Sequence, residues 1–403
     1  MDSHNSRPYD LVVFGATGFT GALVAEYLAG LDTSFSWAIA GRSSSKLEDV
    51  KQRIGVSSLP TIVADSADPE SLRAMVEQTR VVISTVGPYA LHGTPLIMAC
   101  AEAGTHYCDL TGEAQWMASV YDKATAAANE TGARLVHTCG FDCIPSDMGV
   151  FFAQQTMLDL HGCYAKEVSG RMGRQKGAVS GGTVASMMLA VEQGASDPVA
   201  RKALQDPYSL YPPEIAPGLD GSDQSGVRWD DKFQSWTGPF VMAAINTKVV
   251  RRSNALGSLL YGSDFRYEEA TLADNRRGAM MVAAGSALAL LLFVLKPTRY
   301  LLKRQLPKPG EGPSKTVRET GFFEFFVHAH HPEDPGKDVR VLVKGQRDPG
   351  YGATARMLAQ AGLCLAFDDL TVEGGVWTPA SAMGDALVKR LADADVTFEV
   401  VDL

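Results

Sequence analysis

The sequence predicts an α/β fold, with a doubly wound parallel sheet in the first third of the chain and a mixed α+β unit after it. Up to residue 147, short apolar runs alternate with helix-like segments, which is typical of successive βαβ units. A glycine-rich turn follows the first apolar run. Beyond that point the regular alternation is lost, and the chain ends in helices that we expect to pack back on the first unit.

Six strands and five helices are expected in the first unit. The strands are Asp10–Phe14, Ser36–Ala40, Thr61–Ala64, Val81–Thr85, Tyr107–Asp109 and Arg134–Thr138, and the helices are Gly21–Ala29, Ser45–Ile54, Asp68–Gln78, Gly93–Ala103 and Gln115–Thr131. Asp68 and Pro69 support one of these assignments, because aspartate is favoured at a helix N-cap and proline at the first helical position.

The second unit has a less regular pattern. A helix is expected at Ser146–Leu160, a long loop at Asp206–Ser225, and strands at Lys166–Met172, Val227–Gln234, Phe240–Arg251, Gly321–His330 and Lys337–Lys344. Helices then begin near Gly350 and after Thr378, which is followed by proline. The predicted domains are 1–147 for nucleotide binding, 148–348 for substrate binding or dimerisation, and 349–403 as a helical segment that returns to the first domain.

The glycine turn is typical of a dinucleotide-binding site of Rossmann type. Gly15 permits a tight turn, Gly18 lets a pyrophosphate approach the backbone, and Gly21 lets the helix pack close to the strand. Free N–H groups and the helix dipole then attract the phosphates. The whole turn is therefore a set of candidate cofactor contacts: Gly15, Ala16, Thr17, Gly18, Phe19, Thr20 and Gly21.

The end of the second expected strand indicates which nicotinamide cofactor is bound. An NAD site places an acidic residue about 20 residues after the glycines, but Arg42 stands there, with Ser43 and Lys46 nearby. A guanidinium suits a 2′-phosphate, so we expect NADPH rather than NADH. Further cofactor contacts are expected at strand ends, from Asp65, Gly87 and Pro88.

Composition excludes several classes of protein. A chain of 403 residues with 45% hydrophobic residues can form a large core. Its net charge of −9 argues against a nucleic-acid partner. The six cysteines form no C-x-x-C pair, and the N-terminus does not resemble a signal peptide, so a reduced cytoplasmic protein is expected. No metal site is expected, and His328, His330 and His331 are interpreted as a solvated surface cluster.

The segment Gly278–Leu295 is apolar and uncharged, with basic residues on both sides. Its length as a helix lies at the lower limit for crossing a bilayer. Three interpretations remain open: a buried core helix, a membrane-surface or re-entrant segment that includes residues up to 304, and a single span. A homodimer is a further expectation.

Candidate catalytic groups lie where parallel strands end, because ligands meet that edge of a doubly wound sheet. Tyr89 and His92 follow the fourth strand and are candidate proton donors, and Asp142 follows the sixth. Glu113 is a further candidate to orient a substrate, whereas Asp147 is interpreted as a helix cap. No tyrosine is followed four positions later by lysine, so the Tyr-x-x-x-Lys pair of short-chain dehydrogenases is missing.

Several motifs together carry a resemblance to a known family. They are GATGFTG, AGRS, STVGPY, YCDLTGE, GFDCIPSD, DPGYGATARM and GGVWTPASAMGDAL. The chain resembles the saccharopine dehydrogenase-like oxidoreductases, and within them the branch of bacterial trans-acting enoyl reductases. The resemblance implies an N-terminal Rossmann domain, a second mixed domain and an NADP-type cofactor. It also implies reduction of a double bond that a polyketide synthase leaves unreduced.

Three functions remain open from the sequence. The leading hypothesis is an NADPH-dependent reductase of an activated C=C bond in a lipid-like substrate. The second is a C–N oxidoreductase acting on an imine or amino-acid adduct, for which Arg171, Arg174 and Lys176 are the candidate basic residues. The third is a lipid-associated cofactor-binding protein with little turnover.

Overall fold

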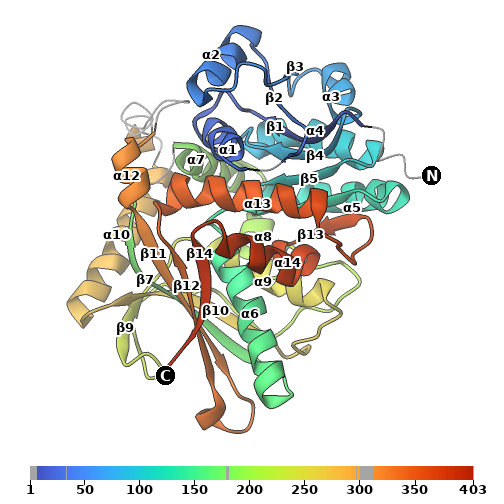
Figure 1. Cartoon of the computed structure of the whole chain (residues 1–403). Helices are drawn as coiled ribbons and strands as arrows, with labels where there is room; N and C mark the ends of the chain where they lie inside the picture. Colours follow the sequence, from blue (N-terminus) through green and yellow to red (C-terminus); the bar gives the residue numbers. More distant parts are fainter. Residues whose placement is uncertain (1–6, 33, 178–180, 296, 300–311, 403) are drawn as a thin grey trace.

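Two seven-stranded sheets organise the molecule, and Figure 1 shows them stacked, with the N-terminal sheet above the second one. The structure is a computed structural model. It describes residues 7–32, 34–177, 181–295, 297–299 and 312–402.

The first sheet, sheet A, is entirely parallel and has the strand order β13-β6-β5-β4-β1-β2-β3. Its strands are β1 (Tyr9–Phe14), β2 (Trp37–Gly41), β3 (Thr61–Val63), β4 (Thr79–Ser84), β5 (His106–Asp109), β6 (Arg134–Val136) and β13 (Gly375–Trp377). The intervening helices are α1 (Phe19–Ala29), α2 (Ser44–Ile54), α3 (Pro69–Val76), α4 (Tyr89–Ala103) and α5 (Ala114–Thr131). This confirms the predicted α/β class.

Strand β1 lies at the point where the strand order reverses, between β4 and β2. Its side chains alternate between two buried cores. Leu11 and Val13 face the core that α1, α2 and α13 (Thr354–Phe367) cover, whereas Val12 and Phe14 face the core under α3, α4 and α5. Helices on both faces make the sheet doubly wound, and the carboxyl end of β1 opens at the position where such sheets bind ligands.

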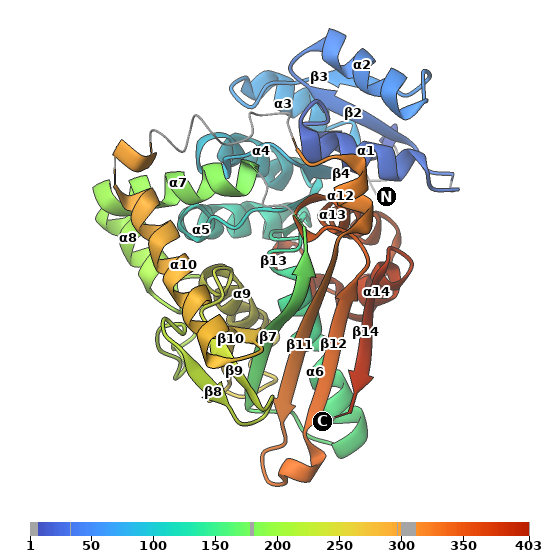
Figure 2. The same ribbon diagram turned by 90° about the vertical axis from the view of Figure 1, so that its left-hand side faces the viewer.

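The second sheet, sheet B, is mixed and has the order β14-β12-β11-β7-β10-β9-β8. Its strands are β7 (Glu167–Lys176), β8 (Arg228–Asp230), β9 (Ser235–Gly238), β10 (Arg266–Ala273), β11 (Phe322–His330), β12 (Val339–Gly345) and β14 (Val396–Val401). Helix α6 (Ile144–His161) packs on β11 and β12, and α9 (Ala243–Leu256) packs on β10 and α6. Figure 2 shows the long strands of sheet B extending away from the nucleotide-binding unit.

The remaining elements lie around these two sheets. They are α7 (Gly181–Ser196), α8 (Pro198–Gln205), α10 (Arg276–Val294), α12 (Lys315–Thr320), α14 (Pro379–Ala392), a 3₁₀ turn at Pro335–Lys337 and a π-helical turn at Pro349–Ala353. Residues 206–225 form the long loop that their composition predicts.

One expected strand is a helix. Phe240–Arg251 was expected to be extended, but α9 begins at Ala243. Almost all of α9 is buried, including Lys248, Arg251 and Arg252. A helix that is buried all round lacks the periodic polar face by which sequence reasoning recognises it, so its β-branched residues suggested a strand.

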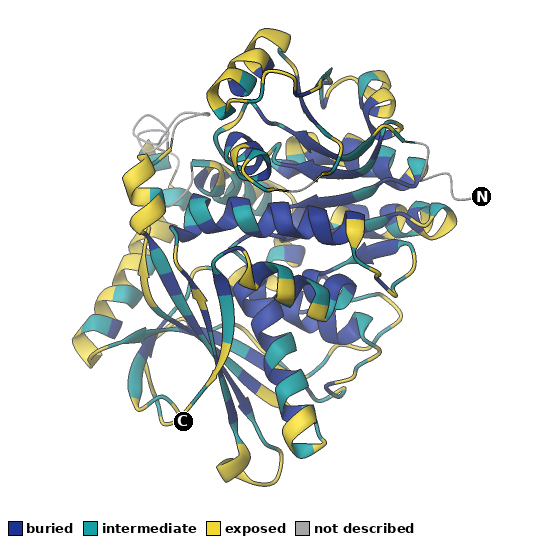
Figure 3. Ribbon diagram, viewed as in Figure 1, coloured by how far each residue is buried: buried dark blue, intermediate teal, exposed yellow. Residues whose placement is uncertain are grey.

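Of the C-terminal helices, α13 packs back on the first unit, as predicted, whereas α14 packs mainly on α13 and α6. Helix α13 contacts β1, β4, β5 and α1, and Figure 3 shows it as a mainly buried helix. The description of 349–403 as helical is wrong, however, because this segment also supplies β13 to sheet A and β14 to sheet B. Both strands are short or lie at a sheet edge, so their sequences lack the hydrophobic pattern by which a strand is predicted.

The apolar segment forms α10, and its interpretation as a buried core helix is wrong. Ala279 is its only buried residue, and the helix appears mainly exposed in Figure 3. Among the described residues, Arg276–Val294 is the one helix long and apolar enough to cross a membrane.

Two buried carboxyl groups lie between α6, α9 and sheet B. Glu269 accepts hydrogen bonds from the Tyr267 hydroxyl (2.7 Å) and the Asn246 amide (3.0 Å). Asp147 accepts from the Ser253 hydroxyl and from the N–H of Ala380 (2.8 Å). Asp147 thus lies within the first turn of α6 and accepts a first-turn N–H of α14, whose N-cap is Thr378. Burial raises the pKa of both carboxyl groups to about 7.

These raised pKa values predict a pH-dependent stability. Between about pH 4.5 and pH 7 the folded state holds these protons more tightly than the unfolded chain, so their contribution is present at low pH and is lost as pH rises to 7. The free energy of unfolding of the wild type should therefore fall relative to Glu269→Gln across this window, by about 1 to 3 kcal/mol. Urea denaturation at a series of pH values measures this.

The matched control for this prediction is the exposed Glu130→Gln. Its unfolding free energy should stay parallel to that of the wild type at all pH values. A parallel curve for Glu269→Gln as well would contradict the prediction.

Candidate active site

The glycine turn adopts the conformation that its sequence predicts. Gly15 has φ +89°, and its N–H donates to the carbonyl of Ala40 at 2.9 Å. The N–H of Gly18 returns to the carbonyl of Gly15 at 2.9 Å, and α1 then begins at Phe19 without a side-chain cap. The first-turn N–H groups of α1 are therefore available to an anion at the carboxyl end of β1.

The turn can pack this closely only because these positions lack side chains. A Cβ on Gly21 would lie 2.3 Å from the Gly15 carbonyl oxygen, and a Cβ on Gly15 would lie 2.7 Å from the Thr85 hydroxyl oxygen. Thr85 in turn donates to the carbonyl of Phe14 at 3.1 Å. This close packing of α1 against β1 and β4 fits the phosphate site of an NAD(P) cofactor.

Arg42 follows β2 and is exposed, and it makes no ion pair within the described parts of the chain. Ser43 is the N-cap of α2 and accepts a hydrogen bond from the Lys46 N–H at 3.4 Å. The Lys46 side chain is also exposed. Two basic side chains and a helix N-terminus thus meet at one point, and this is a suitable environment for a phosphate.

The other expected cofactor contacts also lie at the carboxyl edge of sheet A. Asp65 follows β3 and caps the N–H of Ala67 at 3.0 Å. Gly87 and Pro88 form the turn between β4 and α4, and Gly87 is exposed.

The Tyr89 side chain is buried and packed inside the protein. Its side chain is 4% exposed and stacks on Trp116, and its hydroxyl donates to the carbonyl of Ser84 at 3.0 Å. Burial raises the pKa of this hydroxyl well above its ordinary value. These contacts indicate that the Tyr89 side chain anchors the turn after β4. They do not favour its predicted role as a proton donor.

Glu113 organises the edge of the site instead of facing it. Its carboxylate accepts the N–H groups of Tyr89 and Ala90, both at 2.8 Å, and so caps the start of α4. The Ser186 hydroxyl of α7 donates to the same carboxylate at 2.6 Å. One buried carboxylate thereby joins the β4 turn, the β5 turn and α7.

Asp142 and His92 are the two remaining catalytic candidates. Asp142 follows β6, and its Oδ2 lies 3.6 Å from where a Cβ of Gly112 would stand, so the loops after β5 and β6 meet there. It makes no hydrogen bond among the described residues, and burial raises its pKa to about 6. His92 lies in the first turn of α4 and is exposed.

A buried network that sequence reasoning missed fixes these loops. Asp109 accepts the N–H groups of Thr111 and Thr138, both at 3.1 Å, and also the Tyr107 hydroxyl at 2.9 Å. Its Oδ2 lies 2.8 Å from Nδ1 of His137. Thr138 adopts φ +64° at this point. The position of Asp109 at the end of a buried strand could have indicated this network from the sequence.

The motif that includes Thr354 completes the site from the C-terminal segment. The Thr354 hydroxyl accepts the N–H of Phe141 at 3.1 Å, and Asp348 caps the N–H groups of Tyr351 and Gly352. The Tyr351 ring contacts Phe19 of the glycine turn, with 4.8 Å between centroids. The two sequence motifs GFDCIPSD and DPGYGATARM therefore contact each other in the folded protein.

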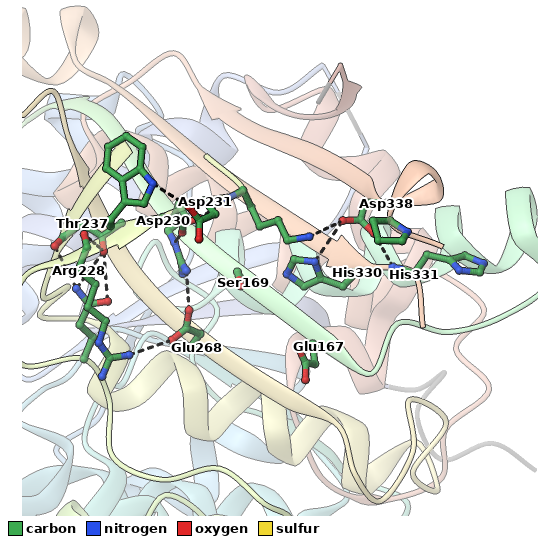
Figure 4. A pocket seen from close by; sticks show the side chains of 15 residues that line it. Glu167, Ser169, Arg228, Asp230, Asp231, Thr237, Glu268, His330, His331 and Asp338 are labelled. Atoms are coloured by element: carbon green, nitrogen blue, oxygen red, sulfur yellow. Dashed lines mark hydrogen bonds and ion pairs between the residues drawn. The ribbon is translucent and has the colours of Figure 1, made fainter. Parts of the chain in front are cut away.

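A cavity of about 460 Å³ lies elsewhere, at the end of sheet B remote from the nucleotide turn. Figure 4 shows its polar lining, in which Arg228 contacts Glu268 and Lys232 contacts Asp338. Arg171 also contributes, with salt bridges to Asp230 and Glu268. Three basic side chains of the lining, Arg171, Arg228 and Lys232, are thus each paired with an acidic one.

The histidine cluster lies beside this cavity. His328 is 2% exposed, so its interpretation as solvated surface is wrong. Its Nε2 lies 2.9 Å from Asp338, which also contacts His330 at 3.3 Å. Arg340 donates to Nδ1 of His328 at 3.3 Å, so the ring proton stands on Nε2 and faces Asp338. Burial lowers the pKa of His328 to about 4, so its ring is a neutral hydrogen-bond donor to Asp338 near neutral pH. The ligand atoms of His328, His330 and Asp338 lie within 4.8 Å of one another.

Comparisons with known proteins agree with this geometry. Residues 11–138 match the family model described as the saccharopine dehydrogenase NADP binding domain. A Mycobacterium tuberculosis protein, provisionally named a trans-acting enoyl reductase, is 40% identical over 98% of each chain. A trans-acting enoyl reductase of Mycobacterium bovis is 39% identical over 97% of each chain. Saccharopine dehydrogenase (L-Glu forming) of Saccharomyces cerevisiae shares the fold, with a TM-score of 0.54, 12% identity, and coverage of 98% of this chain and 100% of that one.

The doubly wound sheet, the glycine turn and the second mixed sheet define an oxidoreductase with an NADP-binding domain. The chain belongs to the family of trans-acting enoyl reductases, within the saccharopine dehydrogenase-like oxidoreductases.

The packing of the turn predicts that Gly21→Ala weakens cofactor binding. The added Cβ would overlap the Gly15 carbonyl and displace the start of α1. Titration with NADPH, followed by nucleotide fluorescence, should show at least about a tenfold loss of affinity, which equals about 1.4 kcal/mol. The matched control is Gly285→Ala, a helical glycine whose Cβ would meet no atom within 4 Å. Wild-type affinity in Gly21→Ala would exclude this phosphate site.

Proposed function

We propose that this protein is an NADPH-dependent enoyl reductase that acts on a lipid or polyketide-derived substrate. The observation that carries the proposal is the partly buried Asp142 carboxyl at the cofactor edge of sheet A, close to Gly112. The relatives named trans-acting enoyl reductase support the type of reaction. When bound, the cofactor supplies a hydride to the β-carbon of the activated C=C bond.

The chain's own residues position the cofactor and supply a proton. The turn at Gly15–Gly21 holds the pyrophosphate, and Arg42 with Lys46 holds the 2′-phosphate. The backbone at Gly87 and Pro88 faces the nicotinamide end, where Glu113 keeps the start of α4 in place.

Arg42→Ala should weaken NADPH binding about 10- to 100-fold and leave NADH binding unchanged, because a charge-assisted pair to phosphate contributes about 1.5 to 3 kcal/mol. Isothermal titration with both nucleotides measures this. The control is Arg53→Ala, an exposed arginine near the other end of α2. Equal losses for the two nucleotides would contradict a 2′-phosphate contact.

Asp142 is the proposed proton donor to the α-carbon of the substrate. Its pKa of about 6 means that part of the population is protonated near neutral pH, whereas an ordinary aspartate would be almost wholly ionised. His92 is the alternative donor, and its exposure makes it suited to exchange protons with solvent.

The activity should therefore fall as pH rises above about 6, because the acid form of Asp142 is lost. Stopped-flow oxidation of NADPH with an α,β-unsaturated acyl thioester gives the pH profile of kcat/KM. Asp142→Asn should lower kcat/KM about 100-fold or more and remove the decrease of kcat/KM above about pH 6. The affinity for NADPH should stay unchanged. If Asp142→Asn keeps both rate and profile and His92→Ala loses them, His92 is the donor.

The same assay separates the alternatives. Arg171 and Arg174, which a dicarboxylate substrate of a C–N oxidoreductase would need, are paired with Asp230 and Glu324 of sheet B. Reduction of cyclic imines with no reduction of enoyl thioesters would overturn the proposal. NADPH binding without turnover of either class would favour a cofactor-binding protein.

A further inference from the structure

We infer that α10 is a docking helix for an anionic lipid bilayer and lies in the plane of the membrane surface. This inference does not depend on which bond the protein reduces. The nucleotide site does not use α10, and this helix carries the largest group of exposed apolar side chains on any described helix.

The apolar side chains of α10 face away from the protein body. Met280, Met281, Leu288, Leu290, Leu291, Val294 and Leu295 have between 45% and 72% of their surface exposed. Soluble monomeric proteins seldom expose a contiguous apolar surface of this kind without a partner for it. Figure 2 shows α10 along an outer edge of the molecule, beside α7, β9 and β10.

One side of α10 is fixed to the protein. Ala279 is fully buried, and a Cβ on Gly238 of β9 would lie 3.0 Å from Val282 and 3.1 Å from the Ala279 carbonyl. Glycine at 238 therefore allows the helix to contact the strand directly. A helix held this way on sheet B cannot cross a bilayer without carrying the sheet into the hydrocarbon, so it is suited to lie at the interface.

The charge around α10 is complementary to acidic lipid headgroups. The chain has a net charge of −9, yet the described residues 275–295 and 297–299 include three arginines and no acidic residue. Arg276 and Arg277 are exposed at the start of the helix. Arg299 follows its end and lies 3.4 Å from Glu192 of α7. Basic residues beside an apolar helix face attract phospholipids of negative charge.

A pair of tryptophans extends this surface at the start of the helix. The guanidinium of Arg276 stacks over the Trp236 ring at 5.5 Å. Trp229, which is 45% exposed, contacts Trp236 with 5.5 Å between centroids. Indole rings favour the headgroup region of a bilayer. This combination of apolar helix, arginines and tryptophans favours a lipid surface over a second copy of the chain.

Cosedimentation of the full-length protein with vesicles tests the inference. The vesicles are phosphatidylcholine alone, and phosphatidylcholine with about one third phosphatidylglycerol. We expect binding to the second kind, weakened by salt. Leu288→Glu with Leu291→Glu should reduce the partition coefficient at least about tenfold, and Arg276→Gln with Arg277→Gln should reduce only the part that depends on phosphatidylglycerol.

The matched control is Leu160→Glu with Val400→Glu, two exposed apolar residues on other elements, which should bind vesicles as the wild type does. Circular dichroism and NADPH titration verify that each variant folds. The inference is overturned if the wild type binds neither vesicle, or if the leucine variant binds equally well. It is also overturned if light scattering shows a wild-type dimer that the leucine variant dissociates, or if alkaline carbonate fails to release the protein from vesicles.

Discussion

Burial of α13 between sheet A and α14 is the interaction on which the rest of the structure depends. All of its residues except Arg356 and Phe367 are buried. Gly362 brings the helix so close to sheet A that a Cβ there would lie 2.4 Å from Ile83. The same helix packs on α14. Because α13 packs on sheet A and on α14, and α14 in turn packs on β14 of sheet B, the nucleotide turn and the second sheet are held in a fixed relation.

That fixed relation explains how distant segments form one site. The loop after β6 is tied to Thr354 at the start of α13, and the loops after β4 and β5 are tied to α7 through Glu113. Asp142 lies in one of these linked loops. Its carboxyl group is partly buried and has no hydrogen-bond partner among the described residues. A carboxyl group in that environment keeps its proton longer as pH rises.

Much of the first unit could be predicted from the sequence. Each buried strand is a short apolar run, and caps such as Asp68 and Thr378 mark helix starts by side-chain chemistry that acts locally. The glycine turn was equally predictable, since its conformation requires residues without a Cβ. These signals act within a few residues of the backbone that they specify.

The second unit was less predictable because tertiary contacts determine it. Helix α9 buries Lys248, Arg251 and Arg252, whose side chains bond to carbonyl oxygens of the loop at 206–225 and of residues 267 and 376. No local sequence pattern indicates these hydrogen bonds between distant segments. In the site, Glu113 looked like a substrate ligand but caps a helix, and Asp109 was overlooked although its network fixes two loops. A carboxylate's partner is set by the fold and not by its neighbours in sequence.

The late position of β13 and β14 in the chain has a consequence for biosynthesis. Sheet A has its edge strand β13 at 375–377, and sheet B ends with β14 at 396–401. During translation, neither sheet can be completed while the ribosome still covers these residues, even though the nucleotide turn emerged some 350 residues earlier. Until these strands have emerged, apolar surface of both sheets stays uncovered, and such surface makes a nascent chain prone to aggregate.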